Sequence, residues 1–271
     1  MPTKCPLCHK NAFALSKFSG YYCYPTSGGC GMSSSVFIKE YQGLLSFRVD
    51  SNEYLSKQID AYAHGLYIPY RSSYSGYLTR LILDLKGSPT CDIDTVKKNA
   101  ATIIQNDLDR IITNLKKYQN FRPTIVAMAR SKPDCFWKEY ELQFRPSIAM
   151  ALSNSNIIVK GSKEKWMLDG INFIKREKET QTTHLGCSGR LRNNGSAPYP
   201  GITKDTCVLC GDVRGKYIIL IDDIYTPGVC VDEDCIQYLY DNGARDVILY
   251  VLGLTIKPPK EVTEEANPDN S

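Results

Sequence analysis

The sequence lacks any long apolar run. Its 271 residues contain no stretch of 18 or more apolar positions, and the first ten, MPTKCPLCHK, contain no apolar signal region. These absences argue against a membrane span and against a secretory signal. The formal net charge of +4 is too small to indicate nucleic-acid binding by itself, although it permits it. We therefore expect a soluble, cytoplasmic protein.

Cysteine, in contrast, is abundant, with eleven residues. In a small secreted chain they would indicate disulfides, but Cys-x2-Cys pairs without a signal sequence indicate metal binding. The N-terminal spacing Cys-x2-Cys-x14-Cys-x6-Cys offers four thiolates to a tetrahedral zinc ion. His9 is an alternative fourth ligand, and free buried thiols are the competing interpretation. Residues 1–49 are predicted to form a zinc ribbon with ligands Cys5, Cys8, Cys23 and Cys30.

Residues 216–254 predict a βαβ unit. Residues 217–221 form a short apolar run that is typical of a buried strand, and residues 246–254 form a second one. Between them, residues 229–242 have helical periodicity, with acids in the first turn and Gly243 as the stop. Such a unit predicts parallel strands and a right-handed crossover.

The polar residues after the first of these strands predict a ligand site. Asp222 and Asp223 end the run, and the turn Thr226-Pro227-Gly228 precedes the helix. Open α/β sheets bind ligands at the carboxyl ends of strands, and a helix N-terminus attracts phosphate. The acids suit sugar hydroxyls or Mg²⁺. A ribose phosphate satisfies both halves, whereas two solvated acids in an ordinary βαβ unit are the competing interpretation.

These residues resemble the ribose-phosphate motif of type I phosphoribosyltransferases, which bind phosphoribosyl pyrophosphate (PRPP). The resemblance implies that Asp222 and Asp223 contact the ribose hydroxyls and that the turn holds the 5-phosphate. Two positions depart from the motif: Pro227 has no N–H, and the thiol of Cys230 replaces a hydroxyl.

Further segments complete an α/β domain. Helices are predicted over residues 77–85, 103–115 and 143–152, with Asp92 or Asp94 as a cap of the second, and strands over 121–128 and 156–160. Residues 36–49 are predicted to finish the ribbon. His64 is expected to be a surface or packed residue. Residues 50–120 are assigned to a helical connector and the start of the α/β domain, 121–256 to that domain, and 257–271 to a disordered tail.

An N-terminal zinc ribbon, the stretch Tyr74 to Lys86 and a phosphoribosyltransferase domain are together similar to the ComF family, which is associated with DNA uptake. The resemblance implies a pyrophosphate loop at Arg130-Ser131-Lys132 and a hood that contains Arg176 and Arg190, with Arg145 in place of an Arg-Gly pair. Exposed loop cations are the competing interpretation of these residues. The predicted substrate-binding residues are Arg130, Ser131, Lys132, Arg176, Arg190, Thr226, Pro227, Gly228, Val229 and Cys230, and the predicted catalytic residues are Asp222 and Asp223.

The hood also contains a second possible zinc site. His184-x2-Cys187 and Cys207-x2-Cys210 are separated by a loop rich in Gly, Asn and Pro, and this spacing is close to a His-Cys-Cys-Cys site. A polar loop histidine and buried thiols are the alternative.

Two functions follow from these patterns. The first is PRPP-dependent transfer or hydrolysis of a phosphoribosyl group with Mg²⁺. The second is a non-catalytic protein of the same fold that binds DNA or a protein partner, in DNA uptake or as an anti-phage effector.

Overall fold

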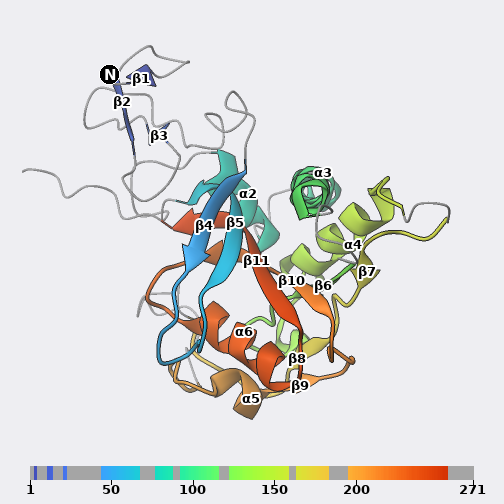
Figure 1. The fold of residues 1–271 in the computed structure, drawn as a ribbon. Coiled ribbons are helices and arrows are strands. Elements are labelled where there is room, and N and C mark those ends of the chain that lie inside the picture. The colour runs from blue at the N-terminus through green and yellow to red at the C-terminus, as the bar shows by residue number, and fades with distance from the viewer. Residues whose placement is uncertain are drawn as a thin grey trace, which may run out of the picture.

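The protein is an α/β structure built on a six-stranded, mostly parallel sheet (Figure 1). This computed structural model describes residues 44–67, 77–87, 92–115, 122–158, 163–182 and 195–255, together with three short strands near the N-terminus. The strand order is β4-β5-β11-β10-β6-β7, with only β4 antiparallel to its neighbour. The strands are β4 (Leu45–Val49), β5 (Ile59–Tyr67), β6 (Pro123–Ala127), β7 (Leu168–Asp169), β10 (Tyr217–Tyr225) and β11 (Asp246–Thr255).

Two apolar cores lie on opposite faces of this sheet. On one face, alternate residues of β10 and β11 pack against α6 (Val231–Asp241). On the other face, the intervening residues pack against α2 (Tyr77–Leu85), α3 (Ile93–Leu115) and α4 (Phe144–Asn154). Because successive side chains of a strand point to opposite faces, continuous apolar runs are what a sheet covered on both sides requires.

The predicted βαβ unit is confirmed: β10 and β11 pair in parallel, and α6 connects them. The helix ends before Gly243, whose φ is 90°, a conformation that glycine adopts without strain. The helices predicted over 77–85, 103–115 and 143–152 and the strand within 121–128 are also present.

Two expectations are corrected, and a third becomes more specific. Residues 45–49, expected to finish the ribbon, instead form the edge strand β4 of the main sheet. In the segment assigned to a helical connector and the start of the α/β domain, strand β5 lies beside β11 in the parallel part of the sheet. The strand beside β6 is β7, whereas residues 156–160 contribute only an isolated bridge at Ile158 among the residues described there.

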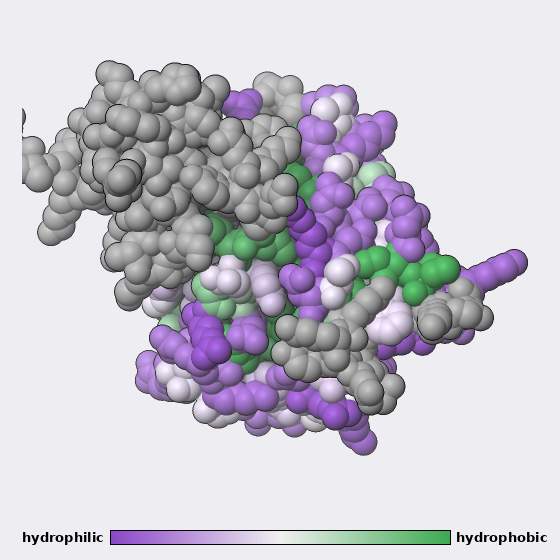
Figure 2. Space-filling view, turned by 45° about the horizontal axis from the view of Figure 1, so that its top comes forward, coloured by the Kyte–Doolittle hydropathy of each residue, from purple (hydrophilic) through white to green (hydrophobic). Residues whose placement is uncertain are grey.

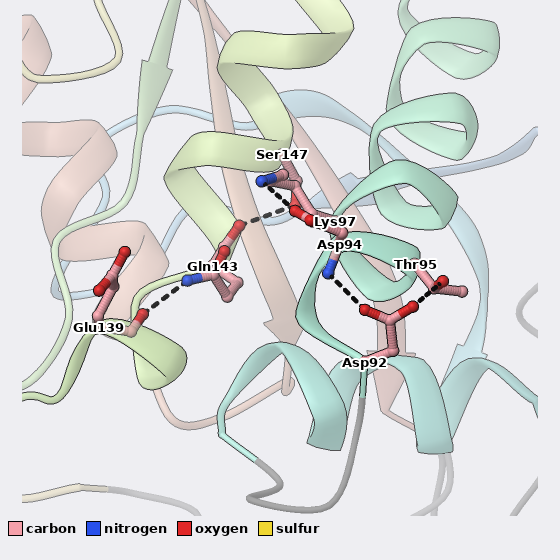
Figure 3. Close-up of polar contacts among 7 residues, drawn as sticks. All are labelled: Asp92, Asp94, Thr95, Lys97, Glu139, Gln143 and Ser147. Carbon is pink, nitrogen blue, oxygen red and sulfur yellow. Dashed lines mark hydrogen bonds and ion pairs between the residues drawn. The ribbon is translucent and has the colours of Figure 1, made fainter.

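Polar contacts lie at the starts of two helices (Figure 3). Asp92 accepts hydrogen bonds from the Asp94 N–H, at 3.2 Å, and from the Thr95 hydroxyl, at 2.5 Å, so Asp92 caps α3. At α4, the Ser147 hydroxyl donates to the Gln143 carbonyl at 2.8 Å, and the Gln143 amide donates to the Glu139 carbonyl at 2.6 Å. The N-cap residue of α4, Gln143, makes no side-chain capping hydrogen bond, so these contacts join its first turn to the preceding segment without capping it.

Smaller elements lie beside the main sheet. β8 (Ile174–Arg176) and β9 (Cys207–Leu209) form an antiparallel pair, and α5 (Ile202–Thr206) directly precedes β9. Near the N-terminus, β1 (Thr3–Lys4), β2 (Asn11–Ala14) and β3 (Tyr21–Tyr22) form a three-stranded antiparallel sheet. The predicted zinc ligands Cys5, Cys8, Cys23 and Cys30, and the alternative His9, lie outside the described residues.

The described surface carries few large apolar side chains. Phe136 and Ile158 are the large hydrophobic residues that are exposed there, and on the face in Figure 2 hydrophilic residues cover most of the described area. No described helix is both long enough and apolar enough to cross a membrane.

A polar network crosses the α3 side of the sheet. Asp107 of α3 is buried and accepts hydrogen bonds from the Tyr250 hydroxyl, at 2.9 Å, and from Nδ1 of His64, at 2.9 Å. His64 is therefore a packed residue with a structural partner, one of the two outcomes expected from the sequence. The network links β5, β11 and α3, because each contributes one member.

We predict that Asp107→Ala lowers the free energy of unfolding by about 1–3 kcal/mol, because it leaves the buried Tyr250 hydroxyl without an acceptor. Chemical denaturation measures the change. Asp94→Ala is the control, since Asp94 is an exposed carboxylate of the same helix that pairs with Lys97. Equal losses in the two variants would contradict the prediction.

Candidate functional site

The two acids of β10 lie beyond the end of the neighbouring strand. The pairing with β6 ends at Ile221 opposite Ala127, and the Met128 N–H then donates to the Ile221 carbonyl at 2.8 Å. On the other side, the pairing with β11 continues past Asp222, which is opposite Val251. From the sequence, we expected the strand to end at the acids. The observed strand includes both acids and continues to Tyr225. The acids are consequently open to the loop that follows β6.

Because they are consecutive in a strand, the two acids point to opposite faces of the sheet. Asp223 lies on the α2 side, where its Oδ1 is 3.0 Å from Nζ of Lys86, the residue after α2. Asp222 lies on the α6 side, where its carboxyl group interacts with that of Asp232. The expectation of one crevice lined equally by both acids is thus too simple, since each acid has its own surroundings.

On the α6 side, burial disfavours negative charge. Burial, then the charge of Asp223, raises the pKa of Asp222 from its ordinary 3.8 to about 7. The side chain of Asp232 is buried, and burial followed by the charge of Asp222 raises its pKa well above the ordinary range. Two buried carboxyl groups beside each other disfavour a second negative charge, so both pKa values shift in the same direction.

On the α2 side, one carboxylate faces several partners. Besides Lys86, the phenol of Tyr67 lies near Asp223, and burial followed by this charge raises the Tyr67 pKa. Burial lowers the pKa of Arg130, and Asp223 gives the strongest of the charge interactions that oppose this shift. Gly253 makes room for Tyr67, because a Cβ at that position would lie 2.7 Å from the Tyr67 Cβ.

The turn before α6 has the geometry of a type II turn. The Val229 N–H donates to the Thr226 carbonyl at 3.1 Å, with Pro227 and Gly228 as central residues and a φ of 84° at Gly228. Nothing lies within 4 Å of where a Gly228 Cβ would be, so the turn faces open space. The Thr226 and Thr255 hydroxyl oxygens are 2.7 Å apart and share a hydrogen bond.

Cys230 follows the turn and precedes the first residue of α6. It is the one described non-glycine residue with a positive φ, at 63°. Its thiol is half-buried, and burial, then the charges of Glu233 and Glu53, raises its pKa. The structure thus presents its backbone at the helix N-terminus, whereas the thiol is not poised as a nucleophile.

The loop after β6 is held by several hydrogen bonds. Nζ of Lys132 is 2.6 Å from Glu179 Oε2, and the hydroxyl groups of Ser131 and Thr182 are 2.8 Å apart. The Arg130 guanidinium stacks on Trp137, 3.9 Å from the ring centroid, and donates to the Glu141 carbonyl. The predicted pyrophosphate loop therefore lies next to the acids and is ordered by protein contacts.

Two arginines predicted near the ligand instead form hydrogen bonds within the protein, at the loop and beside it. Arg176 is buried, donates from Nε to the Arg130 carbonyl at 2.9 Å and donates to the Thr206 hydroxyl. Arg145 bonds to Asp134 at 3.2 Å and to the Ile174 carbonyl at 2.8 Å. Both position backbone rather than project outward. Arg190 lies outside the described residues.

The predicted second zinc site is only half within the described chain. Cys207 is buried in the apolar core on the α6 side, and Cys210 is exposed. His184 and Cys187 lie outside the described residues. Among the described residues, no group of three or more His, Cys, Asp or Glu side chains is arranged to hold a metal. Both zinc sites remain predictions.

The structure adds residues that the sequence did not assign to the site. Lys86 was noted only as the end of a helix, and Tyr67 was not assigned. Asp232 and Glu233 were assigned only to the favourable end of the α6 dipole, yet both are buried. Glu233 accepts a hydrogen bond from the Tyr225 hydroxyl at 2.8 Å. Acids that merely interact with a helix dipole are normally exposed, and only the tertiary structure reveals that these two are not.

Comparisons with protein-family models and with curated protein sequences find no match. Among solved structures, the chain is similar to two crystal forms of a hypoxanthine phosphoribosyltransferase from Staphylococcus aureus. The tetragonal form has a TM-score of 0.30 at 11% identity, with 59% of this chain and 74% of that chain covered. The orthorhombic form has a TM-score of 0.28 at 11% identity, with 65% and 80% covered. Likenesses this weak do not decide function.

We predict that Asp222→Asn stabilises the protein increasingly as pH rises from about 4 to about 7, with a constant gain above that range. The folded state binds a proton at Asp222 that the unfolded state releases near 3.8, so the wild type loses stability across this window. Melting temperatures from pH 4 to 8 should differ by about 2 °C or more at the upper end.

Asp241→Asn, at the far end of α6, is the control, since Asp241 accepts an exposed hydrogen bond from Gln237. A pH-independent difference for Asp222→Asn would contradict the assigned environment.

We also predict that the purified full-length chain contains one or two equivalents of zinc. The double variant Cys5→Ser, Cys8→Ser should lose one equivalent, because a tetrahedral site with two ligands missing binds zinc weakly. Elemental analysis measures the content. Cys135→Ser, at an exposed free thiol, is the control and should retain all the zinc. A wild type without zinc would refute both sites.

Proposed function

We propose that the protein binds PRPP with Mg²⁺ at the carboxyl edge of β10 and β6, and that it transfers or hydrolyses the phosphoribosyl group. One observation carries the proposal: β6 ends four residues before β10, so Asp222 and Asp223, the 130–132 loop and the turn before α6 share one edge of the sheet. Carboxylates, cations and a helix N-terminus at this edge match the three parts of such a ligand.

Each part of the edge has a role in the proposal. Asp223 accepts hydrogen bonds from the ribose hydroxyls, and Arg130 and Lys132 contact the pyrophosphate. The backbone of the turn and the start of α6 bind the 5-phosphate. As pyrophosphate leaves, positive charge develops on the ribose ring, and the adjacent carboxylate stabilises it. Asp222 holds Asp223 in place from the α6 side, since its Oδ1 accepts the Asp223 N–H at 2.7 Å.

Mg²⁺ fits this group of donors. Hard carboxylate oxygens are the ligands it prefers, and Asp232 has a buried Oδ1 with no hydrogen-bond partner among the described residues. Because the two acids face opposite sides of the sheet and no described cluster holds a metal by itself, the ion would be held by one of these acids together with the ligand's oxygens, a common arrangement for Mg²⁺. When bound, it neutralises charge on the pyrophosphate.

A second candidate is a non-catalytic protein that keeps the ligand site, or binds DNA or a protein partner. Features of the turn favour this candidate: Pro227 offers no N–H, the Thr226 hydroxyl is engaged with Thr255, and three acids lie buried in the first turn of α6. Each feature weakens phosphate binding without altering the fold.

We predict that PRPP with Mg²⁺ binds in calorimetry and that Asp223→Asn weakens this binding about tenfold or more, because a carboxylate accepts hydrogen bonds from hydroxyls more strongly than an amide. Asp246→Asn is the control, since Asp246 pairs with Lys57 at the amino end of β11. Release of pyrophosphate, assayed with candidate bases and amines and with water alone, distinguishes transfer from hydrolysis.

Binding without turnover would favour the non-catalytic candidate. No PRPP binding, together with salt-dependent binding of single-stranded DNA, would reject the proposal in favour of a DNA-binding role.

A further inference from the structure

An ion pair covers the carboxylate that the proposed function assigns to ribose. Lys86 Nζ lies 3.0 Å from Asp223 Oδ1, and the two side chains are 29% and 19% exposed. The pair is thus accessible to a ligand although partly shielded from solvent. A ribose that takes up hydrogen bonds to Asp223 must compete with Lys86 for the same carboxylate.

The backbone around Lys86 is held firmly, although its side chain is long. The Lys86 N–H donates to the carbonyls of Ile82 and Leu83 at 3.2 and 3.1 Å. Gly87, with a φ of 106°, packs so closely on the following loop that a Cβ there would lie 2.6 Å from Glu141 Cγ. Because Glu141 also accepts a hydrogen bond from Arg130, the end of α2 and the predicted pyrophosphate loop are joined at this point.

The ion pair is not needed to hold α2 in place. Leu78, Ile82 and Leu85 of this helix are buried in the core on the α2 side, and apolar burial of this kind anchors a helix. Partly exposed pairs between a lysine and a carboxylate contribute little to stability. Stability therefore does not explain why a lysine lies at this position.

The charges beside Asp223 indicate an explanation. On the α2 side, Asp223 faces two cations, Lys86 and Arg130. A ligand whose hydroxyls neutralise neither cation leaves Lys86 without its partner, whereas a ligand that also carries an anion supplies a new one. Lysine suits such an exchange, because its ammonium is a mobile point charge on a flexible stem.

We propose that Lys86 is a substrate-binding residue that moves from Asp223 to the pyrophosphate group when ribose hydroxyls occupy that carboxylate. The inference rests on the proposed function and extends it: Lys86 makes binding depend on a ligand that carries both a sugar and a pyrophosphate. Ribose 5-phosphate alone must break the ion pair without replacing it, and pyrophosphate alone meets a lysine that is still engaged.

The test compares three ligands on the full-length protein. Lys86→Met keeps the length of the side chain and removes its charge. Calorimetry with PRPP, pyrophosphate and ribose 5-phosphate, each with Mg²⁺, should show PRPP weakened about tenfold or more in the variant, and pyrophosphate alone changed far less, because Lys86 stays paired with Asp223 when that ligand binds. Ribose 5-phosphate should bind equally well or more tightly, because Asp223 is then free.

Lys57→Met is the matched control, since Lys57 pairs with Asp246 at 3.4 Å at the amino end of the sheet, and it should change none of the three affinities. Lys86→Arg should restore most of the PRPP binding, which excludes misfolding as the cause. Equal weakening of all three ligands, or unchanged PRPP affinity, would overturn the inference while the proposed function stands. A wild type that binds none of them rejects the proposed function itself.

Discussion

Two adjacent carboxylates inside a parallel sheet require compensation on both faces of that sheet. Asp223 obtains it from a cation, because Lys86 lies within ion-pair distance and Arg130 is nearby. Asp222 obtains it from a proton, because burial against Asp232 excludes a second negative charge. Unpaired charges are costly to bury, so the end of α2 and the first turn of α6 each supply a neighbour to one of the two acids of β10.

This arrangement follows from unequal strand lengths. β11 continues beside β10 and satisfies its backbone through Tyr225, whereas β6 ends at Ala127 and leaves the other side open. The loop after β6 fills part of that opening, and buried Arg176 holds it from behind through the Arg130 carbonyl. The cations of the loop therefore stand at a fixed position beside the acids. Preorganised charge of this kind needs little rearrangement when a ligand binds, which favours recognition of anions.

The sequence predicted the βαβ unit well because its signals are local: apolar runs, a helical period and a glycine stop. It placed the strand end at Asp222, since charged residues seldom lie within buried strands, and it had no means of detecting that β11 continues as a partner there. Strand β5 was not predicted, because Ala61, Ala63 and Gly65 give it few of the β-branched residues that are typical of strands. Lys86 and Asp232 could not be assigned, because their roles depend on contacts between segments far apart in the sequence.

The turn before α6 is the feature on which catalysis and simple binding differ most. Its hydrogen bond from Val229 to Thr226 engages one N–H, and Pro227 has none, so an incoming phosphate depends on Gly228 and on the first residues of α6. Cys230 adopts a left-handed conformation there, which costs roughly 1–2 kcal/mol in a non-glycine residue. Such strain persists only where the surrounding structure enforces it, and here it accompanies the change of direction from the open turn into α6. Gly228 and Cys230 both have a positive φ, and anion-binding backbone nests also contain left-handed residues. In the proposed function, the phosphate would therefore be bound by backbone N–H groups of this segment rather than by its side chains.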